Sequence, residues 1–157
     1  MPYTSFVDGL LLLTRDDHVL LAQRANTGYA DGQWNLPSGK LEADEDLITA
    51  VIRETHEEIG LDLNRDDLDM VTTVHYRNPE GNARVGFFFH ARHWHGQPHN
   101  AEPHKCAQLT WYPVDNLPTN TVPYTRAGIE LFKRGEPFGL QGWPHPTVPT
   151  GIRKELA

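Results

Sequence analysis

One segment of the sequence, residues 39–61, combines an apolar stripe with a dense cluster of carboxylates, and it constrains both the fold and the chemistry. Its apolar residues recur at helical spacing, which predicts an amphipathic helix from Asp46 to Ile59. The residues of this stripe are Ile48, Val51, Ile52 and Ile59. Gly60 is expected to end the helix, because glycine readily adopts the left-handed conformation of a helix terminus.

Three carboxylates of this predicted helix, those of Glu54, Glu57 and Glu58, share one face. Glu57 and Glu58 fall in the last turn, where the helix dipole disfavours a negative charge by about 0.3–1 kcal/mol each. Like charges at this spacing cost a further ~0.2–0.5 kcal/mol per pair. A divalent cation reverses the local field, and carboxylate oxygens suit Mg²⁺ or Mn²⁺. A solvated acidic helix face is the competing interpretation.

Residue types at fixed spacing run from Gly39 through Glu45 to the stretch 53–61, which reads RETHEEIGL. This pattern resembles the signature box of the Nudix hydrolase family, which includes MutT-related proteins. Every fixed position of the box is met, although Thr55 stands where an aliphatic residue is usual. Ser38 stands where glycine is common. The resemblance covers residues 7–126.

The resemblance implies a Nudix-type α/β/α sandwich with a mixed central sheet, and the order of strands and helices favours the same α/β class. The leucine run within residues 5–14 predicts a buried central strand, which is expected to form a hairpin with residues 19–22. Further strands are predicted at 34–36, 68–76, 85–94 and 109–114, and a second helix at 124–133. The expected domain is 1–133, and 134–157 is expected to be an irregular Pro/Gly-rich tail packed on it or extending from it.

Family resemblance also implies roles for the acidic residues. The paired Glu57 and Glu58 are expected to bind a divalent ion, and Glu54 to bind the ion or help to activate water. Arg53 precedes Glu57 by one helical turn, so both the spacing and the family indicate that it orients a carboxylate. The expected catalytic residues are Arg53, Glu54 and Glu57. The expected ligands of Mg²⁺ (or Mn²⁺) are Ser38, Glu54, Glu57, Glu58 and Glu102, of which Ser38 acts through its backbone and Glu102 comes from a later loop. Glu45 is expected in the first helical turn.

Substrate recognition requires an aromatic side chain to stack on a nucleobase and polar groups to read its edge. Tyr29, on a loop rich in Asn, Gly and Asp, and the nearby Asn35 are the candidates for this role, and Arg24 and Lys105 for the phosphates. Other residues considered are Trp34, Trp111 and Tyr124 for stacking, and Arg77 and Arg84 for phosphate contacts. Each of these has a competing interpretation as a core residue or a surface charge.

Composition narrows the partners and the compartment. A formal net charge of −7 argues against a nucleic-acid polymer, which attracts clustered Lys and Arg. The single cysteine, Cys106, excludes an internal disulfide and fits a reducing compartment. No signal-peptide pattern or bilayer-length apolar run is present, so a cytoplasmic protein without a membrane partner is expected.

The resulting functional hypothesis is a metal-dependent hydrolase that cleaves the pyrophosphate bond of a nucleoside diphosphate linked to another moiety. An NTP or dNTP, a modified nucleotide, ADP-ribose and a nucleotide sugar all remain open, because the box is shared among them. The alternative is a non-catalytic Nudix-fold module that binds a nucleotide. A homodimer and a monomer are both compatible with the sequence.

Overall fold

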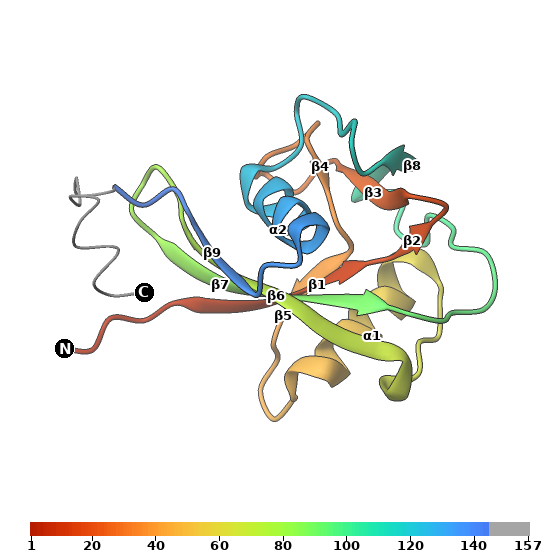
Figure 1. Cartoon of the computed structure of the whole chain (residues 1–157), viewed down its shortest axis with the longest axis horizontal. Coiled ribbons are helices and arrows are strands. Elements are labelled where there is room, and N and C mark those ends of the chain that lie inside the picture. Colours follow the sequence, from red (N-terminus) through yellow and green to blue (C-terminus); the bar gives the residue numbers. More distant parts are fainter. Residues whose placement is uncertain (145–157) are drawn as a thin grey trace.

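A computed structural model describes residues 1–144 of the chain. One of its two sheets has five strands, and β1 (Phe6–Leu12) runs through the interior of this sheet (Figure 1). The strand order is β5-β1-β7-β6-β9. β1 is antiparallel to β5 (Ser38–Lys40) and parallel to β7 (Ala83–Ala91). β6 (Leu68–Arg77) is antiparallel to β7 and parallel to β9 (Phe138–Gln141), so the sheet is mixed, as predicted.

A second, antiparallel sheet contains the four strands β2 (Thr14–Arg15), β3 (His18–Arg24), β4 (Trp34–Asn35) and β8 (Cys106–Pro113). The predicted N-terminal hairpin is therefore present only at its tip, where Thr14 pairs with Val19. β1 itself joins the other sheet between β5 and β7, because both faces of its leucine run are apolar and a central position buries both.

Alternate leucines of the N-terminal run enter two separate cores. Leu10 and Leu12 pack in the same cluster as Ile129 of α2 (Pro123–Arg134), whereas Leu11 and Leu13 pack in the same cluster as Val51 of α1 (Leu47–Ile59). The two helices lie on opposite sides of the five-stranded sheet (Figure 1). Successive side chains of a strand point to opposite faces, so one apolar run supports both helices. The predicted α/β/α architecture is confirmed.

The ends of α1 are set by its flanking residues. Asp46 caps the helix by accepting a hydrogen bond from the backbone N–H of Thr49 at 2.9 Å, and Gly60 ends it at φ 72°. The helix begins at Leu47, one residue later than predicted, because Asp46 takes the capping position. Glu45 was expected in the first turn and instead precedes the helix.

The C-terminal segment contributes a strand to the sheet. The sequence predicted an irregular tail from residue 134, but 138–141 form β9, with Thr73 of β6 opposite Phe138. Such a short strand between Pro137 and Gly142 carries too few residues for a periodic pattern. The remainder of the predicted tail, 145–157, lies outside the described residues. No helix within 1–144 has the length and apolar character needed to cross a membrane.

Candidate active site

Arg53 connects the acidic residues of α1 to the loop before the helix. Its Nε and Nη2 donate to the two carboxylate oxygens of Glu45 at 2.7 and 3.0 Å. Its Nη1 donates to Glu54 at 2.9 Å and to Glu57 at 3.2 Å, so the predicted pair with Glu57 is present. Hydrogen bonding to Glu45 raises the pKa of Arg53. Glu45 is therefore bound by Arg53 before the helix begins, which fixes the loop against α1.

Gly39 leaves the space that Glu54 occupies. A Cβ atom at position 39 would lie 2.1 Å from the Glu54 Cδ and 2.2 Å from its Oε1. The absence of a side chain in β5 therefore allows the carboxylate to approach the strand backbone. Burial raises the pKa of Glu54, and Glu57 and Glu102 add to this effect against the opposing charge of Arg53. Gly39 of the box is therefore explained by the space that the Glu54 carboxylate needs, and not by a turn of the backbone.

Glu58 is the most deeply placed carboxylate of this face. The backbone N–H of Ser38 donates to its Oε2 at 3.0 Å, which links α1 to β5. Burial and the neighbouring carboxylates of Glu54 and Glu102 raise the pKa of Glu58 well above its ordinary value, although the Ser38 N–H opposes the shift. A buried carboxylate with negative neighbours is costly unless a cation or a proton compensates it.

Glu102 reaches this region because its loop docks on the end of α1. The backbone N–H of His99 donates to the Ile59 carbonyl at 3.0 Å, and that of Ala101 to the Glu58 carbonyl at 3.1 Å. Gly60 makes room for the loop, since a Cβ at that position would lie 2.1 Å from the His99 ring. Glu102 was predicted from the sequence alone, which does not reveal this docking of the loop on α1. The Glu102 carboxylate also lies 3.9 Å from the Lys105 Nζ.

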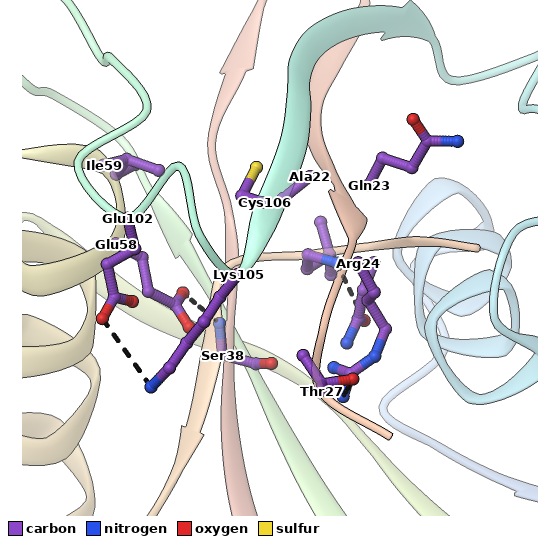
Figure 2. Close-up of a pocket in the computed structure, with 12 residues that line it drawn as sticks. Ala22, Gln23, Arg24, Thr27, Ser38, Glu58, Ile59, Glu102, Lys105 and Cys106 are labelled. Carbon is purple, nitrogen blue, oxygen red and sulfur yellow. Dashed lines mark hydrogen bonds and ion pairs between the residues drawn. The ribbon is translucent and has the colours of Figure 1, made fainter. Parts of the chain in front are cut away.

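Glu58 and Glu102 line a cavity of about 220 Å³, here called the acidic cavity (Figure 2). Figure 2 shows Glu58 and Glu102 on the side of the cavity nearest α1, and Arg24 and Thr27 on the opposite side. The predicted site residues that line the acidic cavity are Arg24, Asn35, Ser38, Glu58, Glu102 and Lys105. Segments far apart in sequence thus place two carboxylates and two cations around one space, which suits a phosphate and a metal together.

The donors fit a hard divalent cation in their chemistry. Glu58 and Glu102 supply carboxylate oxygens, and burial together with the charges of Glu54 and Glu102 raises the pKa of Glu58. Within residues 1–144, no three His, Cys, Asp or Glu side chains already form a group that could hold a metal ion. Mg²⁺ keeps several of its waters and binds proteins through one or two carboxylates, so a complete protein cage is not required for it.

A second cavity of about 490 Å³ adjoins the first and is here called the aromatic cavity. The two cavities share the lining residues Arg24, Thr27, Asn35 and Ser38. Tyr29, which is 56% exposed, lines the aromatic cavity as the sequence predicted, together with Phe6, Tyr76 and Tyr124. The volume is in the range of small-molecule sites, and aromatic walls suit a nucleobase.

The loop that carries Tyr29 is held by a carboxylate. Asp31 accepts hydrogen bonds from the Thr27 hydroxyl at 2.6 Å and the Gly28 N–H at 3.0 Å. Arg24 donates from Nε to the Tyr29 carbonyl at 2.8 Å and from Nη2 to the Thr27 hydroxyl at 3.1 Å. Arg24 is therefore both a lining cation of the two cavities and a support of the loop between them.

Several lining residues of the aromatic cavity were not predicted. Phe6 and Asp8 lie on β1, where the sequence indicated only strand formation, and Lys40 lies on β5, where no strand was predicted. Arg84 was considered only for phosphate contacts, and Tyr124 only for stacking. The one available signal was Asp8, a charged residue inside an otherwise apolar strand, since such residues are rarely buried without a partner.

Other predicted residues lie elsewhere. Glu57 is half exposed, at 49% of its side chain, and like Glu54 it lines neither the acidic nor the aromatic cavity. Trp34 is a core residue against Tyr112, and Trp111 stacks on Trp94, so both match their structural interpretation.

Comparison with known proteins agrees with this geometry. Residues 6–132 match the NUDIX domain. The chain is 48% identical over 61 residues to an RNA pyrophosphohydrolase of Acidiphilium cryptum, which covers 38% of this chain and 37% of that protein. It is 34% identical over 111 residues to the 8-oxo-dGDP phosphatase of Homo sapiens, which covers 69% of this chain and 32% of that protein. The chain thus spans about a third of the length of these two curated relatives.

A solved structure shares the fold at higher coverage. The crystal structure of a MutT NUDIX hydrolase from Burkholderia pseudomallei superposes with a TM-score of 0.74 and 30% identity, over 81% of this chain and 97% of that one. The fold, the box and the matched range together show that this protein belongs to the NUDIX domain family.

Proposed function

We propose that this protein is a divalent-metal-dependent hydrolase that cleaves a pyrophosphate bond of a nucleotide. One observation carries the proposal: the acidic cavity, lined by Glu58 and Glu102, adjoins an aromatic cavity of nucleoside size through four common lining residues. A nucleotide has the same two parts, a polyanionic phosphate chain and a flat heterocycle. The names of the relatives, an RNA pyrophosphohydrolase and an 8-oxo-dGDP phosphatase, support the same reaction class.

We assign the metal to the carboxylates of Glu54, Glu58 and Glu102, whose negative charges repel one another. Glu58 and Glu102 line the acidic cavity, and Glu54 lies close enough to raise the pKa of Glu58. These three would hold Mg²⁺ or Mn²⁺, together with backbone oxygen near Ser38 and water. A bound divalent ion supplies charge neutralisation on the phosphates and lowers the pKa of a water molecule. Glu57 contributes through Arg53, whose guanidinium it shares with Glu54.

The protein's own side chains bind and orient the phosphates. Arg24 lines the acidic cavity opposite its carboxylates and Lys105 lines it beside Glu102, and both would neutralise phosphate oxygens there. Arg53 holds the carboxylates of Glu45, Glu54 and Glu57, so its role is to position them. Phosphoryl transfer depends mainly on such positioning and on electrostatic stabilisation, because little covalent chemistry falls to the protein.

The substrate class favoured by the two cavities is a nucleoside diphosphate or triphosphate, including modified forms. The aromatic cavity accepts one nucleoside, and the acidic cavity of about 220 Å³ suits a phosphate chain better than a second sugar or nucleoside. ADP-ribose and nucleotide sugars are therefore the less favoured substrates. A compact anionic substrate is compatible with the net charge of −7 when the bound metal screens the repulsion. A cytoplasmic location follows from this substrate as part of the same proposal.

The experiment is a phosphate-release screen with the full chain, in Mg²⁺ or Mn²⁺, coupled to pyrophosphatase and phosphatase. The panel contains ribo- and deoxyribonucleoside triphosphates and diphosphates, an oxidised dGTP, ADP-ribose and a nucleotide sugar. We expect turnover of a nucleoside di- or triphosphate that EDTA abolishes and added Mg²⁺ restores. Absence of turnover across the panel, together with thermal stabilisation by one nucleotide, would instead indicate a binding module.

A further inference from the structure

A buried network of three side chains lines the aromatic cavity and has no role in the proposed hydrolytic chemistry. Asp8 is 6% exposed and receives two hydrogen bonds of 2.7 Å from Arg84, one from Nε and one from Nη2. The hydroxyl of Tyr124 donates to Asp8 Oδ2 at 3.1 Å. All three residues line the aromatic cavity, and they come from β1, β7 and α2.

The backbone is adapted to bring this network together. Asp8 of β1 stands opposite Gly86 of β7 in the parallel register. A Cβ at position 86 would lie 2.2 Å from the Tyr124 hydroxyl oxygen, so a glycine is needed for that hydroxyl to reach Asp8. Burial and the Asp8 charge raise the pKa of Tyr124, which keeps its hydroxyl protonated as a donor. The network is thus a built feature of the fold.

The network leaves one hydrogen-bonding group available. Two of the three nitrogens of the Arg84 guanidinium are bound to Asp8, and within the described residues Nη1 has no hydrogen-bond acceptor. The Arg84 side chain is 28% exposed, against 9% for Asp8. Asp8 already accepts three hydrogen bonds, whereas a carboxylate offers about four positions. This network therefore presents chiefly a donor to a ligand in the cavity, the N–H groups of Nη1.

A second polar group of the cavity is also a donor. The side-chain oxygen of Asn35 already accepts from the backbone N–H of Leu36 at 2.9 Å and from the hydroxyl of Thr125. Its Nδ2 remains to donate into the cavities that Asn35 lines. Two fixed donors favour a heterocycle edge made of acceptors, such as a ring carbonyl beside a ring nitrogen. Adenine presents its amino group, itself a donor, where an oxopurine presents a carbonyl.

We infer that Arg84, fixed by Asp8 and Tyr124, is a specificity-determining residue that selects nucleotides whose base carries a ring carbonyl and discriminates against adenine. This inference rests on the proposed function, because it places the nucleoside of the substrate in the aromatic cavity. Asp8 and Tyr124 are positioning residues, since they act on the base through the guanidinium. Tyr29 provides the exposed aromatic face for stacking.

The test compares ITP with ATP, which differ chiefly in a carbonyl against an amino group at position 6 of the purine. For the wild-type chain we expect kcat/KM for ITP to exceed that for ATP by roughly tenfold to a hundredfold, the range of one good base contact. In Arg84→Gln the ITP advantage should fall to within a few-fold, through a loss of kcat/KM for ITP. Equal turnover of ITP and ATP by the wild type, or an ATP preference, would overturn the inference while leaving the proposed function intact.

Matched variants separate specificity from folding. Arg92→Gln removes a guanidinium that also pairs with an aspartate, Asp69, but lies outside both cavities, so the ITP/ATP ratio should be unchanged. Tyr124→Phe keeps the Asp8–Arg84 pair and should lower the ratio several-fold, mainly through KM for ITP. If Arg84→Gln does not fold, the ITP/ATP ratio of Tyr124→Phe decides whether the network sets specificity. An unchanged ratio in a folded Arg84 or Tyr124 variant would assign the network to structure alone.

A binding measurement keeps the inference testable without turnover. Failure of all nucleotides in the hydrolysis assay would count against the proposed function. IMP and AMP would then be compared by calorimetry with the wild-type chain in Mg²⁺. Tighter binding of IMP by about tenfold would support the inference, and equal affinities or no binding of either nucleotide would overturn it.

Discussion

The acidic cavity and the aromatic cavity share one wall but differ in how the sequence specifies them. The carboxylates of α1 beside the acidic cavity are organised locally, because Arg53 binds Glu45, Glu54 and Glu57 within a short stretch of chain. The cavity itself also takes Arg24 and Glu102 from other segments. The aromatic side is assembled from distant segments, as the contact between Asp8 and Tyr124 shows. Under the proposed function, the carboxylates assigned to the reaction are therefore specified largely by local sequence, whereas the residues assigned to substrate choice depend on tertiary structure.

The two cavities also differ in their electrostatics. In the acidic cavity, burial and then the charges of Glu54 and Glu102 raise the pKa of Glu58. In the aromatic cavity, the buried Asp8 is compensated by Arg84 and Tyr124. The first arrangement would be stabilised by a cation, as the proposed function requires, whereas the buried charge of the second is paired within the protein. Substitutions in the two cavities should therefore affect different measurements.

The largest expected effect belongs to Glu58→Gln, which removes the buried charge but keeps the side-chain shape. We expect kcat to fall by at least about a hundredfold, because a group that organises charge at the reacting phosphate is lost. The metal-free variant should be at least as stable as the wild type, and Mg²⁺ should raise the melting temperature of the wild type more than that of the variant. Both quantities are measured by phosphate release and by thermal denaturation.

The control for Glu58→Gln is Glu130→Gln on α2, where the carboxylate meets Lys133 at 3.6 Å outside both cavities. Its turnover and its response to Mg²⁺ should match those of the wild type, because an exposed ion pair contributes little. Full activity in Glu58→Gln, with the control behaving normally, would remove the assignment of the metal to the acidic cavity.

The difference between the cavities also explains what the sequence could predict. The spacing of Glu54, Glu57 and Glu58 on one helical face is a local property, so both the helix and the carboxylate cluster were predicted. The depth of Glu58 against Ser38 and the half exposure of Glu57 depend on how α1 packs on β5, and spacing alone does not rank the two residues. The box pattern does not distinguish Glu57 from Glu58, whereas the fold gives the two side chains different exposure.

Residues of the aromatic cavity were predicted only where they lie near the box or on the loop rich in Asn, Gly and Asp. Tyr29 and Asn35 meet those conditions, and both line the aromatic cavity. Arg84 and Asp8 became partners only through the parallel pairing of β1 with β7, which joins residues 76 positions apart. The residue pattern of either strand alone does not determine this register, because both strands carry apolar residues on both faces.

A smaller loss of activity is expected from Gly39→Ala, which tests the geometry of the acidic side without changing any charge. The new Cβ would occupy the position of the Glu54 carboxyl group, at 2.1 Å from Cδ, so that side chain must move. We expect a roughly tenfold to hundredfold loss of kcat with KM nearly unchanged, since misplacement of a catalytic group by about 1 Å has effects of this size. Steady-state kinetics on the preferred nucleotide measures both constants.

Gly139→Ala on β9 is the matched strand substitution. Its Cβ would lie 2.7 Å from the Leu131 Cδ1, the end of a flexible side chain on α2 and away from both cavities. This variant should lose some thermal stability and retain wild-type kcat. If Gly39→Ala showed the same pattern, the box glycine would serve packing and the close approach of Glu54 would have no catalytic value.

The smallest effect is expected at Thr55, on the face of α1 that packs away from the carboxylates. Thr55 is 1% exposed, and its hydroxyl donates to the Val51 carbonyl at 2.7 Å, one turn earlier. Thr55→Val leaves that carbonyl with its helical N–H partner, so no buried group loses its last hydrogen bond. Because such back-bonding hydroxyls slightly destabilise helices, we expect an increase of up to about 1 kcal/mol in the free energy of unfolding.

For a chain of this size, that increase corresponds to roughly 2–4 °C in melting temperature, with kcat/KM unchanged within about twofold. The same substitution at Thr49 should act in the opposite direction, because that hydroxyl donates to the capping Asp46 at 2.8 Å and accepts from Arg65 at 3.0 Å. A drop in kcat for Thr55→Val at unchanged stability would show that packing beneath α1 and the chemistry on its opposite face are coupled. The expected result is that the two faces of this helix are separable, stability residing in one and turnover in the other.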